Sequence, residues 1–139
     1  MKVKDVMHSG VTSVSPDTKV TQIARKMRDE DIGAIPVVEN DHLIGMVTDR
    51  DIACRGFANG HDLPHLTARD VMSMPMLFCH SDDEVASAIQ LMEKSKIRRL
   101  PVLNERKHMV GMLTLGDISQ KVPHALAGEV IQSLSAHHA

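Results

Sequence analysis

Residues 45–52 read GMVTDRDI, and residues 111–118 read GMLTLGDI. Each stretch holds a glycine, an apolar pair, a threonine three residues after the glycine and an aspartate three residues after the threonine. An apolar run that ends at Thr-x-x-Asp is typical of a strand leading into a helix, because the two side chains can satisfy the free backbone N–H groups of the first turn. The repeated stretch therefore predicts two copies of one strand–helix unit.

The similarity extends along most of the 139 residues. At an offset of 65 positions, KDVM at 4–7 aligns with RDVM at 69–72, and AIPVVE at 34–39 aligns with RLPVLN at 99–104. Repeats of this length are the signature of an internally duplicated fold. A unit of about 60 residues buries only ~60% of its unfolded surface. We therefore expect the two copies to stabilise each other.

Each copy predicts the order β-α-β-β-α. The first helix is indicated by apolar residues at positions i, i+3, i+4 and i+7, starting at Val20 in one copy and at Val85 in the other. The expected strands are 11–15, 34–38 and 43–48 in the first copy and 76–80, 99–103 and 109–114 in the second, and the final helices begin at Asp49 and Gly116.

These elements predict an α+β fold, in which two β-α-β-β-α repeats are related by a pseudo-twofold axis and pack through their sheets. The first repeat is expected at 1–60 and the second at 67–123. A linker within 54–66 is indicated by two glycines, a proline and an asparagine. The tail 124–139 is a candidate for a short C-terminal helix.

Composition excludes several classes of protein. The formal net charge is −2 and the chain holds two Phe and no Tyr or Trp, which argues against binding nucleic acid by charge or by base stacking. No run approaches the ~20 apolar residues of a membrane span, and the first ten residues lack a signal-peptide core. Cys54 and Cys79 lack metal-type spacing and predict free thiols in a reducing compartment. We therefore expect a cytoplasmic protein that contacts no membrane.

The paired Thr-x-x-Asp motifs have two interpretations. Each can be a helix cap and nothing more. Alternatively, each aspartate can accept hydrogen bonds from the two hydroxyls of a ribose, while the threonine hydroxyl and the helix N–H groups serve a phosphate. A cap alone does not explain the glycine before each threonine, because a glycine within a strand marks close approach by backbone or ligand.

Taken together, the DVM openings, AIPVVE and RLPVLN, and the doubled GMVTDRDI and GMLTLGDI resemble a tandem pair of cystathionine beta-synthase (CBS) domains, a Bateman module of the stand-alone bacterial type. The resemblance covers nearly the whole chain. It implies adenosine-type ligands in clefts between the two repeats: AMP, ADP or ATP, with NAD and S-adenosylmethionine as alternatives. A Mg ion accompanying the phosphates is the metal that such ligands would bring; no catalytic cofactor is implied.

The resemblance also implies that the acidic residue of one repeat works with a strand of the other. The first cleft would hold Met46, Thr48, Arg50 and Asp51, faced by Ile97, Arg98 and Arg99 with His80 and Val85 nearby. The second would hold Met112, Thr114, Gly116 and Asp117, faced by Ser15, Val20, Ile32, Gly33 and Ala34. Three arginines in the first cleft, unless they only form a solvated face, favour a more highly phosphorylated ligand there.

The leading hypothesis is a non-catalytic regulatory protein in signal transduction, in which nucleotide occupancy alters conformation or dimer geometry. Its expected partners are a second copy of the chain, as a homodimer, and a separate effector protein. The alternative is a structural dimerisation module without a physiological nucleotide. An enzyme is the third possibility; no nucleophile–base motif supports it, and the nine dispersed histidines indicate no dedicated metal site.

Overall fold

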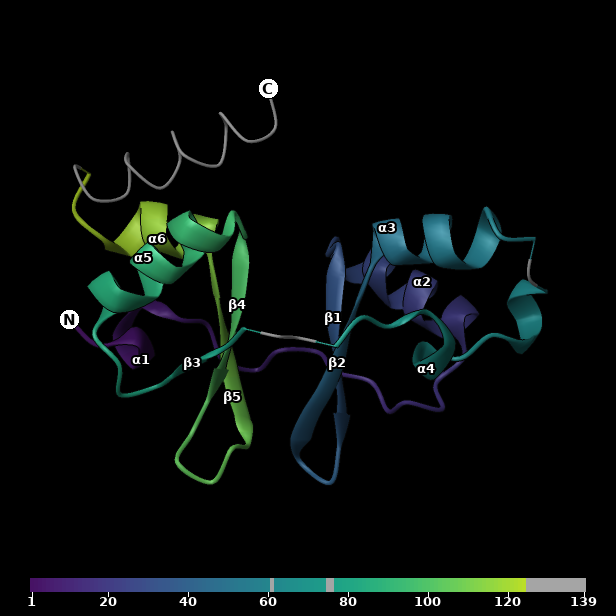
Figure 1. Ribbon diagram of the computed structural model, residues 1–139, viewed down its shortest axis with the longest axis horizontal. Coiled ribbons are helices and arrows are strands. Elements are labelled where there is room, and N and C mark those ends of the chain that lie inside the picture. Colours follow the sequence, from purple (N-terminus) through teal and green to yellow (C-terminus); the bar gives the residue numbers. More distant parts are fainter. Residues whose placement is uncertain (61, 75–76, 125–139) are drawn as a thin grey trace. The chain divides into compact units, whose positions relative to one another are not determined.

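A computed structural model describes residues 1–60, 62–74 and 77–124, which fall into two compact units (Figure 1). Unit 1 combines Met1–Val11 with the chain from Leu77 onward, and unit 2 runs from Thr12 to Met76. The possible helix in the tail lies outside the described residues, apart from position 124. Each unit mixes helices and strands, so the α+β fold with two repeats is confirmed.

Unit 2 is built around an antiparallel hairpin. Strands β1 (Ala34–Glu39) and β2 (His42–Thr48) pair from Ala34 opposite Thr48 to Glu39 opposite His42. Both turn residues, Asn40 and Asp41, have positive φ, which matches the twist that a two-residue hairpin needs. The helices of this unit are α2 (Val20–Glu30), α3 (Asp49–Asp51), a π-helix over Ile52–Phe57, a short 3-10 helix over Leu63–His65, and α4 (Ala68–Val71).

Unit 1 repeats this plan with an extra short strand. Its sheet has the order β3 (Cys79–His80), β4 (Arg99–Leu103), β5 (Met109–Thr114); β3 pairs parallel with β4, and β4 pairs antiparallel with β5. Within residues 1–11 and 77–124, its helices are α1 (Val3–Val6), α5 (Val85–Ser95) and α6 (Leu115–Lys121).

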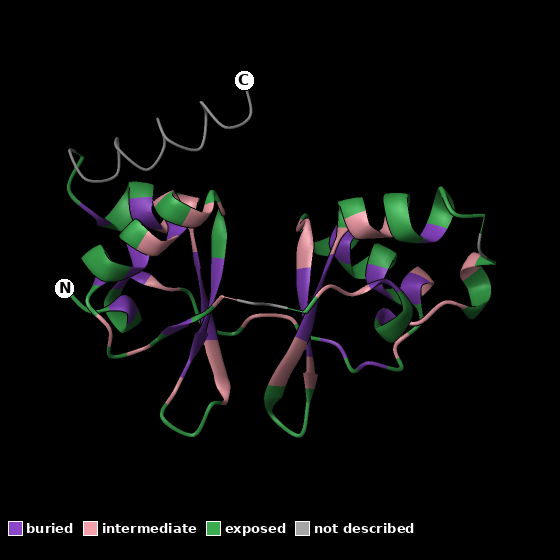
Figure 2. Cartoon of the chain, viewed as in Figure 1, coloured by how far each residue is buried: buried purple, intermediate pink, exposed green. Residues whose placement is uncertain are grey.

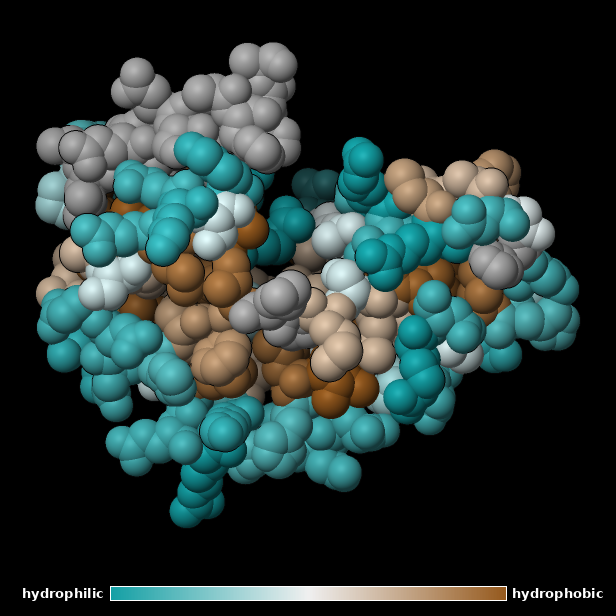
Figure 3. All heavy atoms as spheres, in the orientation of Figure 1, coloured by the Kyte–Doolittle hydropathy of each residue, from teal (hydrophilic) through white to brown (hydrophobic). Residues whose placement is uncertain are grey.

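Each unit has its own apolar core beneath its strands, and Figure 2 shows buried residues on the strands and on one side of the helices. The predicted stripe of α5 lies entirely in the core of unit 1, with Ile89 almost fully buried. The predicted stripe of α2 lies in the core of unit 2 at Val20, Ile23 and Met27, whereas its fourth member, Ala24, is exposed. Hydrophilic residues cover the hairpin turn of each unit (Figure 3). The alternation of apolar and polar residues therefore sets which side of each element faces the core.

The beginning of each repeat differs from the sequence prediction. Residues 11–15 do not form a strand; Val14 makes a single parallel bridge to Val37, with N–O distances of 2.8 and 3.0 Å to the neighbouring β1 backbone. In the second repeat the strand is limited to β3. The final helix of the first repeat begins at Asp49 as predicted, but continues as the π-helix through Phe57 into the segment expected as a linker.

The two DVM segments form short helices that the periodicity did not predict. We call residues 2–8 leader 1 and residues 67–73 leader 2. Leader 1 packs in unit 1, where the backbones of His8 and Met112 exchange hydrogen bonds of 3.1 and 3.0 Å. Leader 2 packs in unit 2, where Ser73 and Met46 do the same at 2.9 and 2.8 Å. Leader 1 begins the first repeat but packs in unit 1, with the strands of the second repeat. Leader 2 begins the second repeat but packs in unit 2, with the strands of the first repeat.

Candidate functional site

The first Thr-x-x-Asp motif lies where β2 ends and α3 begins. The Asp51 N–H donates to Thr48 Oγ1 at 3.0 Å, and the Thr48 N–H donates to Asp51 Oδ2 at 2.9 Å. This is a complete capping box. The Asp51 side chain is 14% exposed, and its second oxygen, Oδ1, lies 3.7 Å from Arg55 Nε on the next helical turn. We call this arrangement the Asp51 corner.

The second motif repeats the arrangement where β5 leads into α6. The Asp117 N–H donates to Thr114 Oγ1 at 3.1 Å, and the Thr114 N–H donates to Asp117 Oδ2 at 2.9 Å. The Thr114 hydroxyl is also 2.9 Å from this oxygen. One further group reaches it here: His8 Nδ1, from leader 1, lies 2.8 Å from Asp117 Oδ2. The Asp117 side chain is 15% exposed. We call this arrangement the Asp117 corner.

The cap interpretation of both motifs is therefore confirmed, but the caps do not use the whole carboxylate. In each corner the capping bonds end on Oδ2. Within the part of the chain that the structure describes, neither Oδ1 accepts a hydrogen bond from another residue, so each keeps lone pairs for a donor from outside the protein.

A third Thr-x-x-Asp, at Thr67 to Asp70, begins leader 2 and also forms a capping box. It has no glycine three residues before the threonine and does not follow one of the hairpin strands. The motif alone therefore identifies a helix start, and the glycine-containing strand distinguishes the two corners from it.

Packing of the leaders explains those glycines. A Cβ atom added to Gly45 would lie 2.5 Å from Met72 Sδ, and one added to Gly111 would lie 2.7 Å from Met7 Sδ and 2.8 Å from the His8 carbonyl oxygen. The close approach that the sequence indicated is therefore made by the methionine of a DVM segment and, at Gly111, by backbone. Sequence reasoning missed this role of Met7, Met72 and His8, although the paired DVM segments were visible.

Nine of the expected site residues lie in unit 2. Ala34 pairs with Thr48 across the hairpin, and the Asp49 N–H donates to the Gly33 carbonyl at 2.9 Å, so the start of β1 adjoins the Asp51 corner. Val20 is a core residue, Met46 is buried, and Arg50 is exposed. The remaining members of this set are Ser15, Ile32 and Asp51.

The other nine expected residues lie in unit 1. Arg99 pairs with Thr114, and the Leu115 N–H donates to the Arg98 carbonyl at 3.0 Å, so the start of β4 adjoins the Asp117 corner. Val85 is a core residue. The remaining members are His80, Ile97, Met112, Gly116 and Asp117. Each expected cleft combines residues from both units, and this grouping stays a prediction.

Burial raises the pKa of the Cys79 thiol to about 12, with a smaller contribution from Asp83, so this cysteine is not an activated nucleophile. Among the described residues, no three His, Cys, Asp or Glu side chains lie close enough together to hold a metal ion. No helix in the same part of the chain is long and apolar enough to cross a membrane.

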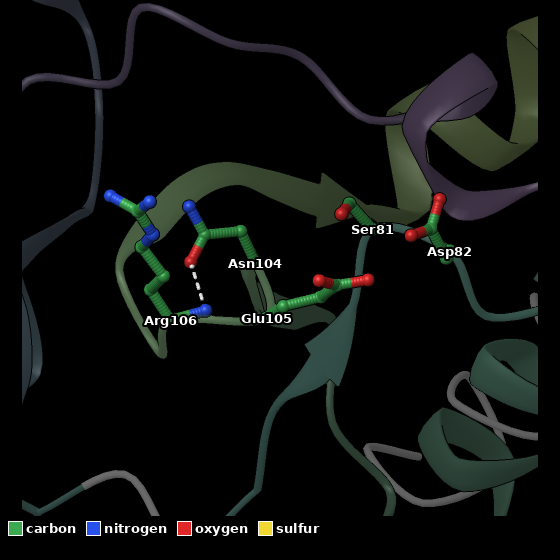
Figure 4. Close-up of a pocket in the computed structure, with 5 residues that line it drawn as sticks. All are labelled: Ser81, Asp82, Asn104, Glu105 and Arg106. Atoms are coloured by element: carbon green, nitrogen blue, oxygen red, sulfur yellow. Dashed lines mark hydrogen bonds between the residues drawn. The ribbon is translucent and has the colours of Figure 1, made fainter.

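A surface depression of about 270 Å³ lies elsewhere in unit 1, between the residues after β3 and the turn after β4 (Figure 4). It is lined by Ser81, Asp82, Asn104, Glu105 and Arg106. Two of these five side chains are carboxylates, and the Arg106 guanidinium extends away from them (Figure 4). None of the expected site residues lines this depression.

Two α+β units that end their hairpins in matching Thr-x-x-Asp corners define a tandem-repeat module. The chain belongs to the CBS domain family, because the model of that family matches residues 3–55 and 68–124. The resemblance stated from the motifs is therefore confirmed.

Several curated relatives match most of this chain. The CBS domain-containing protein YhcV of Bacillus subtilis is 37% identical over 134 residues, which is 96% of this chain and 94% of that protein. Hypoxic response protein 1 of Mycobacterium tuberculosis is 36% identical over 125 residues, 88% of this chain and 87% of that protein. The chain spans 65% of the Methanopyrus kandleri protein MK0525, with 35% identity over 128 residues.

Solved structures agree with the fold. Hypoxic Response Protein I with two coordinated zinc ions matches with a TM-score of 0.80 and 35% identity over 88% of this chain and all of that chain. The CBS domain pair of MJ0100 in complex with 5-methylthioadenosine and S-adenosyl-L-methionine matches with a TM-score of 0.74 and 25% identity, over 86% and 94% of the chains. CBSX2 in complex with AMP matches in fold, with a TM-score of 0.76 and 23% identity, over 86% and 93%.

Proposed function

We propose that this chain is a non-catalytic regulatory protein that binds an adenosine-type nucleotide at its Asp51 and Asp117 corners. The observation that carries the proposal is the carboxylate oxygen Oδ1 in each corner, which accepts no hydrogen bond from the described residues while a complete cap holds the side chain at the end of a hairpin strand. The complexes of MJ0100 with S-adenosyl-L-methionine and of CBSX2 with AMP support an adenosine-type ligand for proteins of this fold.

The chemistry of the corner suits a ribose better than a phosphate. A carboxylate repels a phosphate, whereas two adjacent hydroxyls can both donate to it, and each hydrogen bond to a charged group contributes ~1.5–3 kcal/mol. The cap holds the carboxylate in place before the ligand arrives, which reduces the entropy cost of binding. The cap and the ligand therefore use different lone pairs of one side chain.

The phosphates would be bound by arginines. Arg50, Arg98 and Arg99 are all exposed, and guanidinium groups bind phosphate oxygens in pairs. We propose that ADP or ATP, with Mg, binds through Asp51 and these arginines, and that Asp117 takes a smaller ligand beside Gly116 and Gly33; NAD and S-adenosylmethionine are the alternatives. Occupancy would act by favouring one of two conformations of a homodimer that a separate effector protein recognises.

The proposal is tested by calorimetric titration of AMP, ATP and S-adenosylmethionine into Asp51→Ala and Asp117→Ala proteins. Each variant should lose affinity at its own corner by about 10- to 100-fold, equivalent to ~1.4–2.8 kcal/mol, because the ribose loses its acceptor. The free energy of unfolding should fall by about 1 kcal/mol, as for a lost cap.

Asp70→Ala is the matched control, because it removes the carboxylate of the third Thr-x-x-Asp cap. It should cost a similar amount of stability and leave nucleotide affinity unchanged. The completeness of both caps favours a second candidate, a structural dimerisation module. Unchanged affinity in both corner variants, with the proteins folded, would replace the nucleotide proposal with this module.

A further inference from the structure

The two corners differ in the basic side chain that lies beside each aspartate. At the Asp51 corner it is Arg55, whose Nε lies 3.7 Å from Oδ1 without a hydrogen bond. At the Asp117 corner it is His8, whose Nδ1 lies 2.8 Å from Oδ2. An arginine keeps its charge at all physiological pH values, whereas histidine is the side chain that gains or loses charge near neutrality.

The position that carries His8 is equivalent in the two leaders. Both His8 and Ser73 directly follow the methionine that packs on a glycine, and both bridge to the methionine of the adjoining strand. The Ser73 hydroxyl donates to the Met46 carbonyl at 3.4 Å rather than to Asp51. The contact from leader to aspartate is therefore a feature of the Asp117 corner.

This contact changes how much of each carboxylate a ligand can use. Asp117 Oδ2 is within hydrogen-bond distance of the Thr114 N–H, the Thr114 hydroxyl and His8 Nδ1. A carboxylate oxygen has two lone pairs, so Oδ2 is fully engaged. Asp51 Oδ2 accepts from the Thr48 N–H. A diol can share both oxygens of Asp51 but has Oδ1 alone at Asp117.

We infer that His8 is the specificity-determining residue that makes the Asp117 corner the weaker, pH-dependent diol site of the pair. This inference rests on the proposed function. When the imidazole is protonated, it forms an ion pair with Asp117 and reduces the negative charge that a ribose hydroxyl meets. The Asp51 corner, with Arg55, keeps the same charge throughout.

The other charged groups around His8 are already engaged. On α1, the Lys4 ammonium lies 3.0 Å from Asp82 Oδ1, and the Asp5 carboxylate accepts from the Lys2 N–H at 3.2 Å. On α6, the Lys121 ammonium donates to the Val6 carbonyl at 3.3 Å. Strand β5 carries no titratable side chain. Asp117 is therefore the group whose interaction depends on the protonation of His8.

The test isolates the Asp117 corner with Asp51→Asn, since asparagine keeps a capping oxygen and removes the charge. Adenosine is titrated calorimetrically at about pH 8 and about pH 5.5, because it has a ribose but no phosphate that would titrate itself. The affinity of Asp51→Asn should fall about 2- to 5-fold at the lower pH, the size expected for a pair whose histidine is half exposed. Adding His8→Ser should abolish this fall.

The reciprocal protein, Asp117→Asn, isolates the Asp51 corner and should bind adenosine equally well at both pH values. His65→Ser is the matched control, because it removes an exposed histidine that also pairs with an aspartate, Asp62 at 3.3 Å. It should leave the pH dependence of Asp51→Asn intact.

If Asp51→Asn and Asp117→Asn each weaken adenosine binding but the pH profile is the same with and without His8, the inference about His8 is overturned. The proposed function would then still stand. If neither asparagine variant changes adenosine binding, the proposed function fails and the inference fails with it.

Discussion

Two methionines and two glycines link the repeated motifs to each other. Met72 of leader 2 lies on Gly45 of β2, and Met7 of leader 1 lies on Gly111 of β5. A side chain at either glycine would occupy the space of the methionine. The DVM segment and the glycine of the strand are therefore two halves of one packing contact, contributed by different repeats.

This contact predicts unequal effects for two matched substitutions. Gly111→Ala should destabilise unit 1 by about 1–3 kcal/mol, as overpacking does, because the new methyl group meets the His8 carbonyl as well as Met7. Gly45→Ala should cost less, because the added atom meets the flexible Met72 side chain. Denaturant unfolding of both variants measures the difference.

Substitutions of the methionines separate the cost of the contact with the methionine side chain from the cost of the contact with the His8 carbonyl. Met72→Ala should restore most of the stability lost in Gly45→Ala, since it removes the atoms that collide. Met7→Ala should restore only part of the stability lost in Gly111→Ala, since the contact with the His8 carbonyl oxygen stays. Equal costs and equal rescue in the two units would contradict this account.

At the scale of elements, the sequence predicted the hairpins and the first helix of each repeat well. Their signals are local: alternating burial, an apolar stripe and a two-residue turn all lie within one element. The strand–helix corners were also predicted, because the capping box is written in four consecutive residues. The acidic residues before α5 lie outside the helix, since α5 starts at Val85 with no acidic residue in its first turn, and Asp83 accepts from the His80 N–H at 2.9 Å.

Elements that depend on distant contacts were not predicted. Leader helices of four residues are too short for a periodic pattern, and their stability comes from burial of residues such as Val6 in the other repeat. The π-helix at Ile52–Phe57 has no sequence signature of its own. The contact between His8 and Asp117 joins residues 109 positions apart, so spacing gives no indication of it.

Strand β3 gives a prediction about thiol reactivity. Cys79 on this strand is 3% exposed and its pKa is raised to about 12, whereas Cys54 is exposed. At about pH 8 the thiolate fraction of Cys79 is roughly 1 in 10,000, so the folded protein should show one rapidly reacting thiol and the denatured protein two. A disulfide-exchange reagent with optical readout counts them, and Cys54→Ser should remove the rapid phase.

The same shift sets the sign of an alkaline effect on stability. Between about pH 9 and 12 the unfolded protein loses the Cys79 proton before the folded protein does, so the free energy of unfolding falls as pH rises through this range. Cys79→Ala should make this part of the profile flatter. Two thiols that react at equal rates in the native protein would contradict the burial of Cys79.

For the whole molecule, each leader packs with the strands of the other repeat, an arrangement that we call the exchange of leaders. This exchange determines which unit each mutation in a leader weakens. Val6 and Val71 occupy equivalent places in leaders 1 and 2 and are both buried, Val6 in the core of unit 1 and Val71 in that of unit 2. A mutation near the beginning of the first repeat therefore acts on the strands of the second.

Hydrogen exchange read by mass spectrometry tests this crossed dependence. Val6→Ala should cost about 2 kcal/mol through the cavity it leaves and should speed exchange in α5, β4 and β5. Val71→Ala, its matched counterpart, should speed exchange in α2, β1 and β2. Faster exchange in the repeat that carries the mutation, with the other repeat unchanged, would refute the exchange of leaders.

The arrangement of the leaders also orders events during synthesis on the ribosome. Unit 2 is a continuous stretch of chain and has every segment it needs once Ser73 has emerged. Leader 1 is made earlier but meets its strand partner, Met112, only after about 100 more residues, a delay on the order of ten seconds at about 10 residues per second. The middle of the chain can thus acquire its structure first, while the earliest residues wait for the last strand.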